Sequence, residues 1–189
     1  SNSYTIYFRS PEITATTALE LSYETFATEG QDEYCCLKVL YLSVSISDVT
    51  VLVNGLQTDI VGTITLDESE EFTFAIKIPE GQGIKNEISV RLGDQTSEPV
   101  YFDYLAPGIT TTTPDLYMTN GSLVTINGAN FGMLAPRVYF GDELMTVISN
   151  SHTKLVCISP EGEGFTPRKI VIDAFGLKSC NTDIAFSCI

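Results

Sequence analysis

The sequence predicts an all-β fold of two consecutive β-sandwiches, and two observations carry this prediction. Residues 79–83 (PEGQG) recur as residues 160–164 (PEGEG), and the sequences on either side of the two copies also resemble each other in the same order. Such a repeat indicates that the chain contains two copies of one folding unit. Strand signals dominate both copies, because apolar and polar residues alternate in short runs broken by Asn-Gly, Gly-Asp and Pro-Glu-Gly turns.

In the first copy, the alternation is clearest at residues 71–78. From Phe72 to Ile78 every second residue is apolar, and the residues between them are Thr, Ala and Lys. Successive side chains of a strand point to opposite faces, so this pattern predicts a strand that is buried on one side only. The same pattern predicts half-buried strands at residues 49–53 and 87–92.

In the second copy, the pattern predicts about seven strands, which is typical of a β-sandwich. They are expected near residues 109–112, 122–127, 137–141, 145–149, 154–158, 168–175 and 183–188. The repeated Pro-Glu-Gly segment is predicted to form the same inter-strand hairpin in each sandwich.

The two copies are joined by residues 105–108 (LAPG), whose proline favours an extended chain. The predicted domains are therefore residues 11–105 and residues 106–189. Residues 4–8 (YTIYF) resemble the closing strand of each copy. Residues 1–10 are therefore interpreted as the terminal strand of an upstream module or as a linker, and we expect the chain to be a piece of a longer repeat protein.

The chain is strongly acidic, with 10 Lys and Arg residues against 24 Asp and Glu residues and a formal net charge of −14. This field repels polyanions, so neither nucleic acid nor an anionic membrane surface is expected as a partner. The simplest role of the charge is to keep an exposed protein soluble. No run approaches the ~20 apolar residues of a membrane-spanning helix, and no charged-then-apolar leader opens the chain.

The five cysteines suit a disulfide better than a metal site. None forms a C-x-x-C pair, and the single histidine, His152, leaves too few ligands for structural zinc. Adjacent Cys35 and Cys36 rarely bond each other, because the geometry is strained. The preferred disulfide joins Cys157, on a strand, to Cys180, in the hairpin beside the last strand. A secreted, disulfide-bearing domain is thus expected, with buried free thiols in a cytosolic protein as the alternative.

Catalytic chemistry is not expected. A hydrolase triad needs a histidine between a nucleophile and an acid, and His152 lies in the polar turn 150–153 (NSHT), where a surface loop residue is the simpler interpretation. Neither a phosphate-binding G-x-x-x-x-G-K-[ST] motif nor a D-x-D-x-D-G calcium series occurs. The chain is therefore predicted to be no enzyme and to need no cofactor or metal.

One motif in the second copy is typical of a known family. Residues 121–132 (GSLVTINGANFG) resemble the opening signature of the IPT/TIG domain, an immunoglobulin-like fold found in plexins, hepatocyte-growth-factor-type receptors and some transcription factors. In this reading Val124 and Ile126 face the core, Phe131 fills the end of the sandwich, and the two later glycines permit turns. The resemblance spans residues 107–188.

The first copy departs from the signature, because no Gly-x-Asn-Phe-Gly follows its strand at residues 36–42. It is therefore identified as a degenerate IPT/TIG domain, and the predicted fold class is two tandem immunoglobulin-like (E-set/TIG) β-sandwiches. The Thr-rich residues 109–114 (ITTTTP) and the low basic content are similar to the tandem TIG repeats of social-amoeba surface proteins, which mediate cell adhesion and allorecognition.

This resemblance implies an extracellular fragment of a cell-surface receptor, whose parent is anchored in the plasma membrane while this fragment does not touch it. It would bind another surface protein of the same or a related family in trans, through homophilic or heterophilic contact. The alternative is a structural spacer or a carbohydrate-binding accessory module of a secreted protein. Carbohydrate binding usually uses tryptophan platforms, and the chain has no tryptophan.

Candidate sites are few. Asn120 begins the only N-x-S/T sequon, in a predicted turn, and is the candidate for glycosylation. Tyr34, Tyr117, Met118 and Phe165 are the candidates for a protein interface, because exposed aromatic and apolar side chains usually carry such contacts. The binding surface is expected where the two copies differ.

Overall fold

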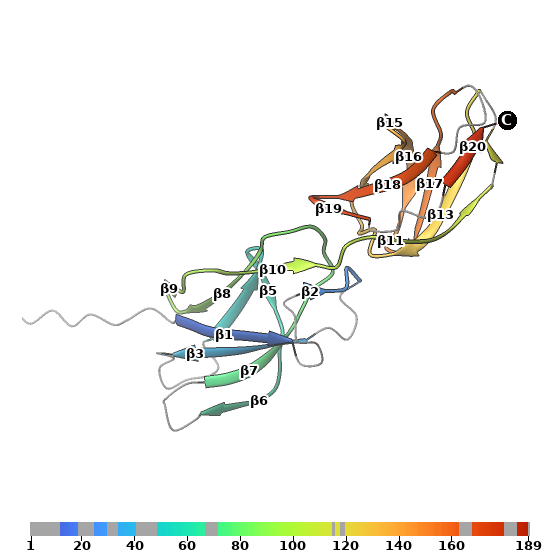
Figure 1. Cartoon of the computed structure of the whole chain (residues 1–189). Coiled ribbons are helices and arrows are strands. Elements are labelled where there is room, and N and C mark those ends of the chain that lie inside the picture. Colours follow the sequence, from blue (N-terminus) through green and yellow to red (C-terminus); the bar gives the residue numbers. More distant parts are fainter. Residues whose placement is uncertain are drawn as a thin grey trace, which may run out of the picture. The chain divides into compact units, whose positions relative to one another are not determined.

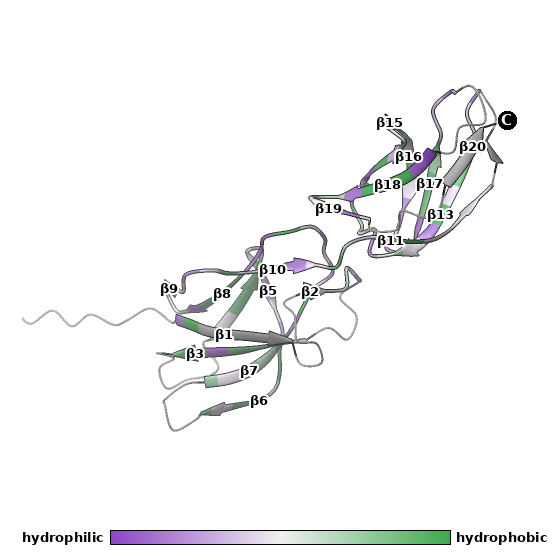
Figure 2. Cartoon of the chain, in the orientation of Figure 1, coloured by the Kyte–Doolittle hydropathy of each residue, from purple (hydrophilic) through white to green (hydrophobic). Residues whose placement is uncertain are grey.

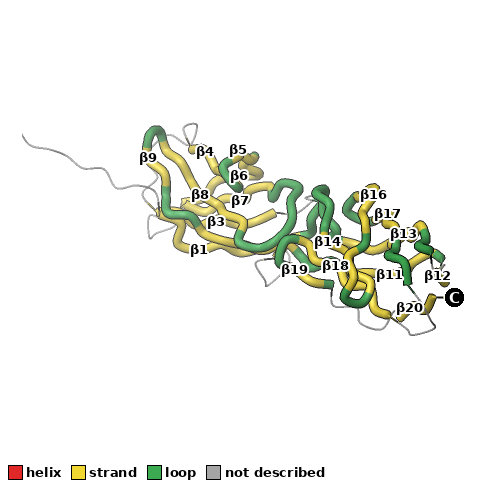
Figure 3. Tube along the Cα trace, turned by 90° about the horizontal axis from the view of Figure 1, so that it is seen from above, coloured by secondary structure: helices red, strands yellow, loops and turns green. Residues whose placement is uncertain are grey.

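The computed structural model of the chain describes residues 12–18, 25–29, 34–40, 49–66, 72–114, 116–117, 120–162, 168–179 and 185–188. These residues form strands, turns and loops, and no helix occurs among them (Figures 1 and 3), which confirms the predicted all-β class. The chain divides into two compact units. The first comprises Ser1–Thr25, Asp32–Pro79 and Lys85–Phe102, and the second comprises Phe26–Gln31, Glu80–Ile84 and Asp103–Ile189.

The first ten strands form two sheets. One sheet has the order β1 (Glu12–Ala18), β3 (Tyr34–Leu40), β7 (Phe72–Lys77) and β6 (Ile60–Leu66). The other has the order β2 (Thr25–Phe26), β10 (Val100–Tyr104), β8 (Asn86–Leu92), β4 (Val49–Val53) and β5 (Leu56–Thr58), and β9 (Gln95–Thr96) pairs with β8. Phe74, Ile76 and Ile78 are buried while Lys77 is exposed, so the predicted one-sided burial is confirmed.

The next ten strands repeat this topology, with every strand number raised by ten. One sheet has the order β11 (Gly108–Thr113), β13 (Leu123–Ala129), β17 (Lys154–Ile158) and β16 (Thr146–Asn150). The other has the order β12 (Leu116–Tyr117), β20 (Ala185–Cys188), β18 (Arg168–Ala174), β14 (Arg137–Phe140) and β15 (Glu143–Leu144), and β19 (Leu177–Lys178) pairs with β18. The seven predicted strands correspond to the longer ones; β12, β15 and β19 have two residues each and carry no periodic signal.

The core of the second sandwich is formed by both of its sheets. It contains Ile109, Val124, Ile126, Phe131, Val138, Phe140, Met145, Leu155, Cys157, Ile170 and Ile172, all nearly or completely buried. Along the strands, hydrophobic residues are interrupted by polar ones (Figure 2). Val124 and Ile126 face this core and Phe131 is fully buried in it, as the family signature implied.

The repeated Pro-Glu-Gly segment is not a hairpin. Residues 78–85 join β7 to β8, and these strands belong to different sheets; residues 159–167 join β17 to β18 in the same way. A short turn sequence is compatible with either connection, and the sheet in which each strand finds its neighbours decides between them. The predicted strand at residues 4–8 lies outside the described residues.

Candidate functional site

Two features of the second unit stand out: a polar cluster around His152 and the outer face of one sheet. The polar cluster begins with the loop that follows β13. Asn130 has a left-handed backbone (φ 60°), which asparagine tolerates better than most residues. The loop is tied to the β16–β17 turn, since the Phe131 N–H donates to the carbonyl of His152 at 3.0 Å.

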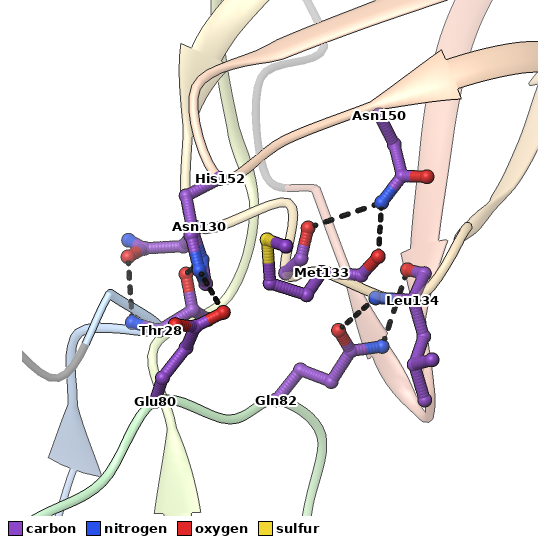
Figure 4. Close-up of polar contacts among 9 residues, drawn as sticks. Thr28, Glu80, Gln82, Asn130, Met133, Leu134, Asn150 and His152 are labelled. Atoms are coloured by element: carbon purple, nitrogen blue, oxygen red, sulfur yellow. Dashed lines mark hydrogen bonds and ion pairs between the residues drawn. The ribbon is translucent and has the colours of Figure 1, made fainter.

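His152 lies between two residues from earlier in the chain, Thr28 and Glu80, both within the second unit (Figure 4). Its Nδ1 is 2.8 Å from the Thr28 hydroxyl, and its Nε2 is 3.1 Å from Glu80 Oε1. An ionised carboxylate only accepts hydrogen bonds, so this arrangement favours the proton on Nε2 and a hydrogen bond from the Thr28 hydroxyl to Nδ1. Nε2 is buried, and its contact with Glu80 is an ion-pair distance without hydrogen-bond alignment.

The expectation that His152 is a simple surface loop residue is therefore wrong: its side chain is only 12% exposed. Tertiary contacts cover it, and they come from residues more than seventy positions away in the sequence. A hydroxyl, an imidazole and a carboxylate in a row are also the components of a hydrolase triad. Thr28, however, is only 1% exposed. Its hydroxyl is not accessible to a substrate, and what the row provides is one buried hydrogen bond between Thr28 and His152 beside the half-exposed Glu80 carboxylate.

A second set of contacts surrounds Gln82 (Figure 4). The Gln82 Nε2 donates to the carbonyl of Leu134 at 3.3 Å, and the Leu134 N–H donates to Gln82 Oε1 at 2.9 Å. The side-chain amide thus pairs with a peptide group as a neighbouring strand would. Gly132 makes this possible, because a Cβ there would overlap the Gln82 side chain. Asn150 supports the loop by donating from Nδ2 to the carbonyl of Met133 at 2.6 Å.

The second feature is the outer face of the sheet β11–β13–β17–β16. Leu123 on β13 pairs in register with Ile158 on β17, and their exposed fractions are 60% and 44%. The register of β16 shifts between Val147 and Ser149, and Ile148 at this bulge is 54% exposed. Three large aliphatic side chains therefore lie in water on adjacent strands. We refer to this surface as the β13–β17 face.

The β13–β17 face is nearly uncharged. Its register rows contain Leu123, Ile158 and Thr146; Thr113, Thr125, Val156 and Ser149; and Thr111, Asn127 and Lys154. Lys154 is the one charged residue in these rows, although 34 of the 189 residues are Lys, Arg, Asp or Glu. The other sheet of the same sandwich differs. Arg137 pairs in register with Asp173, and the guanidinium of Arg168 lies 2.7 Å from the Glu143 carboxylate.

The two copies differ at the end of the β13–β17 face that carries Leu123 and Ile158. The first sandwich has Tyr34 and Lys77 as the register pair that corresponds to Leu123 and Ile158. Tyr34 is half-buried and Lys77 is exposed. The first copy thus carries the positive charge of Lys77 where the second copy carries the aliphatic side chain of Ile158. The predicted interface residue Tyr34 occupies the position that corresponds to Leu123.

The other predicted site residues are placed as follows. Asn120 is exposed in a turn, which suits a glycan. Tyr117 lies in β12, which pairs in parallel with β20, and its side chain is not described. Met118 and Phe165 lie outside the described residues. Leu123, Ile148 and Ile158 were missed, although the alternation in residues 122–127 would have placed an apolar Leu123 on the outer face.

The predicted disulfide between Cys157 and Cys180 is not supported. Cys157 is a free thiol that is fully buried, because the alternation of β17 directs it into the core beside Leu155 and Ile126. Burial raises the pKa of this thiol from 9.0 to about 11. Cys180 lies outside the described residues. Among the described residues, no group of three or more His, Cys, Asp or Glu side chains is arranged to hold a metal ion.

No helix long and apolar enough to cross a membrane occurs in the described part of the chain. Residues 107–186 match the IPT/TIG domain family. No curated protein matches the chain.

Several solved structures are similar to the chain. The adhesin InvE of Yersinia pseudotuberculosis is 10% identical, with 87% of this chain and 56% of that chain covered and a TM-score of 0.49. SGBP-B from a xyloglucan utilization locus of Bacteroides uniformis is 14% identical, with 90% and 48% covered and a TM-score of 0.36. A gamma-CGTase from alkalophilic Bacillus clarkii is 19% identical, with 87% and 23% covered and a TM-score of 0.40. The chain thus spans 23% to 56% of the lengths of these proteins.

Proposed function

We propose, with residues 107–186 forming an IPT/TIG domain, that the chain is the extracellular part of a surface recognition or adhesion receptor. It would act by binding rather than by catalysis. It would contact another surface protein in trans, homophilic or heterophilic, through the β13–β17 face. The observation that carries this proposal is the exposure of Leu123, Ile148 and Ile158 on a face with a single charge. Exposed apolar groups in a polar surface are typical of protein-binding sites.

The size of the face supports a weak contact. Four strands about 4.8 Å apart and five residues of about 3.3 Å each cover roughly 19 Å by 17 Å. A stable interface buries about 800 Å² on each partner, which is more than this face alone can offer. Adhesion would therefore depend on many copies acting together, since linked weak contacts gain affinity through effective concentration.

An extracellular location is part of the proposal. Asn120, the first residue of the sequon, is exposed in a turn before β13. A glycan there would extend into solvent without disturbing the core. On expression in a secretory pathway, the Asn120→Gln variant is expected to lose the glycan that the parent carries.

The test uses the full chain on beads, with cells or beads displaying the candidate partner. The double variant Leu123→Lys, Ile158→Lys places two charges on the β13–β17 face and is expected to abolish clustering. Leu144→Lys is the matched control, because Leu144 is 59% exposed on the other sheet of the same sandwich. Equal clustering of the parent and the double variant would show that this face does not bind. Specific sugar binding on a glycan array would instead favour an accessory carbohydrate module.

A further inference from the structure

The only N-x-S/T sequon of the chain borders the β13–β17 face. Asn120 is exposed in the turn that leads into β13, and Leu123 is the first residue of that strand. Because a chain extends by at most about 3.6 Å per residue, the Cα atoms of Asn120 and Leu123 lie within about 11 Å of each other. The four strands of the face span roughly 19 Å, so a bulky group on Asn120 can reach well across it.

Hydrogen bonds hold this turn against β17. The Ser122 N–H donates to Ser159 Oγ at 2.8 Å, and the Ser159 N–H donates to the carbonyl of Ser122 at 2.9 Å. A Cβ on Gly121 would lie 3.9 Å from Ile158 Cγ2, so the backbone directly after Asn120 lies beside an exposed side chain of the face. The sequon is therefore placed at the end of the face that carries Leu123 and Ile158.

The copy with the aliphatic face is also the copy with the sequon. Tyr34 begins β3 as Leu123 begins β13, and residues 31–33 (QDE) precede Tyr34 where residues 120–122 (NGS) precede Leu123. The first copy has a lysine in the register row where the second has two aliphatic side chains. Both copies share one topology, so the fold does not require the sequon. Its occurrence beside the aliphatic face points to a role at that face.

We propose that an N-linked glycan on Asn120 regulates the β13–β17 face by covering the end that carries Leu123 and Ile158. The inference rests on the proposed function, since it takes the chain to be exported and this face to bind a partner. An N-glycan is bulky and hydrophilic, so a partner can pack on Leu123 only while the glycan is turned away. If the face is open for about a tenth of the time, its apparent affinity falls about tenfold. Occupancy of the sequon would thus set the strength of adhesion.

The glycan would be attached during export by a transferase that uses a lipid-linked oligosaccharide diphosphate. A C–N bond forms between Asn120 Nδ2 and the anomeric carbon of the oligosaccharide, and the glycosyl C–O bond to the diphosphate breaks. The amide gives up one proton as the lipid diphosphate leaves. Ser122, which completes the sequon, is only 7% exposed. The transfer therefore precedes the folding of this sandwich.

The first test measures access to the face without any partner. The full chain with Leu123→Cys is produced in a secretory host, and the rate of labelling by a maleimide-linked polyethylene glycol is compared before and after the glycan is trimmed to its first sugar. Mass spectrometry of the peptide reads the introduced cysteine alone. The glycan should slow the polymer about tenfold, in proportion to the closed fraction, and should leave the rate of N-ethylmaleimide nearly unchanged.

Leu144→Cys is the matched control, because Leu144 is 59% exposed on the other sheet of the same sandwich. The glycan should slow neither reagent at that position. Equal polymer rates at Leu123→Cys with and without the glycan would overturn the proposal, and so would a secreted chain that carries no glycan on Asn120.

The second test is clustering of beads that display the full chain. The trimmed chain and the Asn120→Gln variant should cluster at about a tenth of the surface density that the glycosylated chain requires. Clustering that the glycan leaves unchanged counts against regulation. If no form clusters with itself or with a candidate partner while the glycan still shields Leu123→Cys from the polymer, the proposed binding function fails and the covering of the face by the glycan stands.

Discussion

At the scale of single residues, burial by distant segments determines the chemistry of the second unit. Tyr104 is 1% exposed, and burial, with a smaller contribution from the Glu80 carboxylate, raises its pKa from 10.0 to about 12. Burial also raises the pKa of Cys157, to about 11. Glu80 thus lies near both His152 and Tyr104, and neither neighbour is close to it in the sequence.

These two raised pKa values predict alkaline unfolding of the second unit. Both groups are neutral when protonated, and the unfolded chain releases their protons at lower pH than the folded chain does. The contribution of these two groups to the free energy of unfolding is therefore complete below about pH 9, and it is lost as the pH rises through about 11 to 12. With about 1.4 kcal/mol per pKa unit, each group accounts for up to about 3 kcal/mol.

The measurement is urea unfolding at pH 8 to 11. Tyr104→Phe removes one titrating group and should reduce the decline in the free energy of unfolding over this range. The prediction would be contradicted if the free energy of unfolding of the Tyr104→Phe variant declined with pH as steeply as that of the parent chain.

At the scale of elements, a strand of the second sandwich carries two different functions on its two faces. Val124 and Ile126 on β13 are completely buried, whereas Leu123 on the same strand is 60% exposed. Because the side-chain period of a strand is two, the phase of the alternation assigns each residue to one face. The β16 bulge then adds Ile148 to the outer face, which strict alternation does not predict.

Truncation of a core residue and of an outer residue on β13 should change the free energy of unfolding by different amounts. Ile126→Ala leaves a cavity in the core and should lower the free energy of unfolding by about 2–5 kcal/mol. Leu123→Ala on the same strand should change it by less than about 0.5 kcal/mol, because a mainly exposed side chain loses little on truncation. Chemical denaturation followed by tyrosine fluorescence measures both. Equal losses for the two variants would show that Leu123 is not a surface residue.

At the scale of the whole molecule, the charge of −14 opposes any contact between two copies of this chain. An apolar, nearly uncharged face is the place where two such chains can meet with the least repulsion. Salt shortens the Debye length from about 30 Å at 0.01 M to about 8 Å at 0.15 M. Self-clustering on beads is therefore expected to increase over this range. A decrease would indicate that ion pairs, and not the aliphatic side chains, hold the contact.

The sequence by itself determined the fold class, the longer strands and the match of the second half to the IPT/TIG family. Alternation in segments such as 71–78 and 122–127 is a local property, and so is the Gly-x-Asn-Phe-Gly signature. These features can be recognised without knowing which segments of the chain contact one another. Even the outward position of Leu123 follows from the strand phase.

Only the tertiary structure decided how these elements meet. It showed that the Pro-Glu-Gly segment crosses between sheets, that Cys157 is a buried free thiol, and that Thr28 and Glu80 enclose His152. It also brought Leu123, Ile148 and Ile158 onto one surface. The physical reason is that pairing between strands and contact between loops depend on residues far apart in the chain, and no local pattern specifies which of them meet.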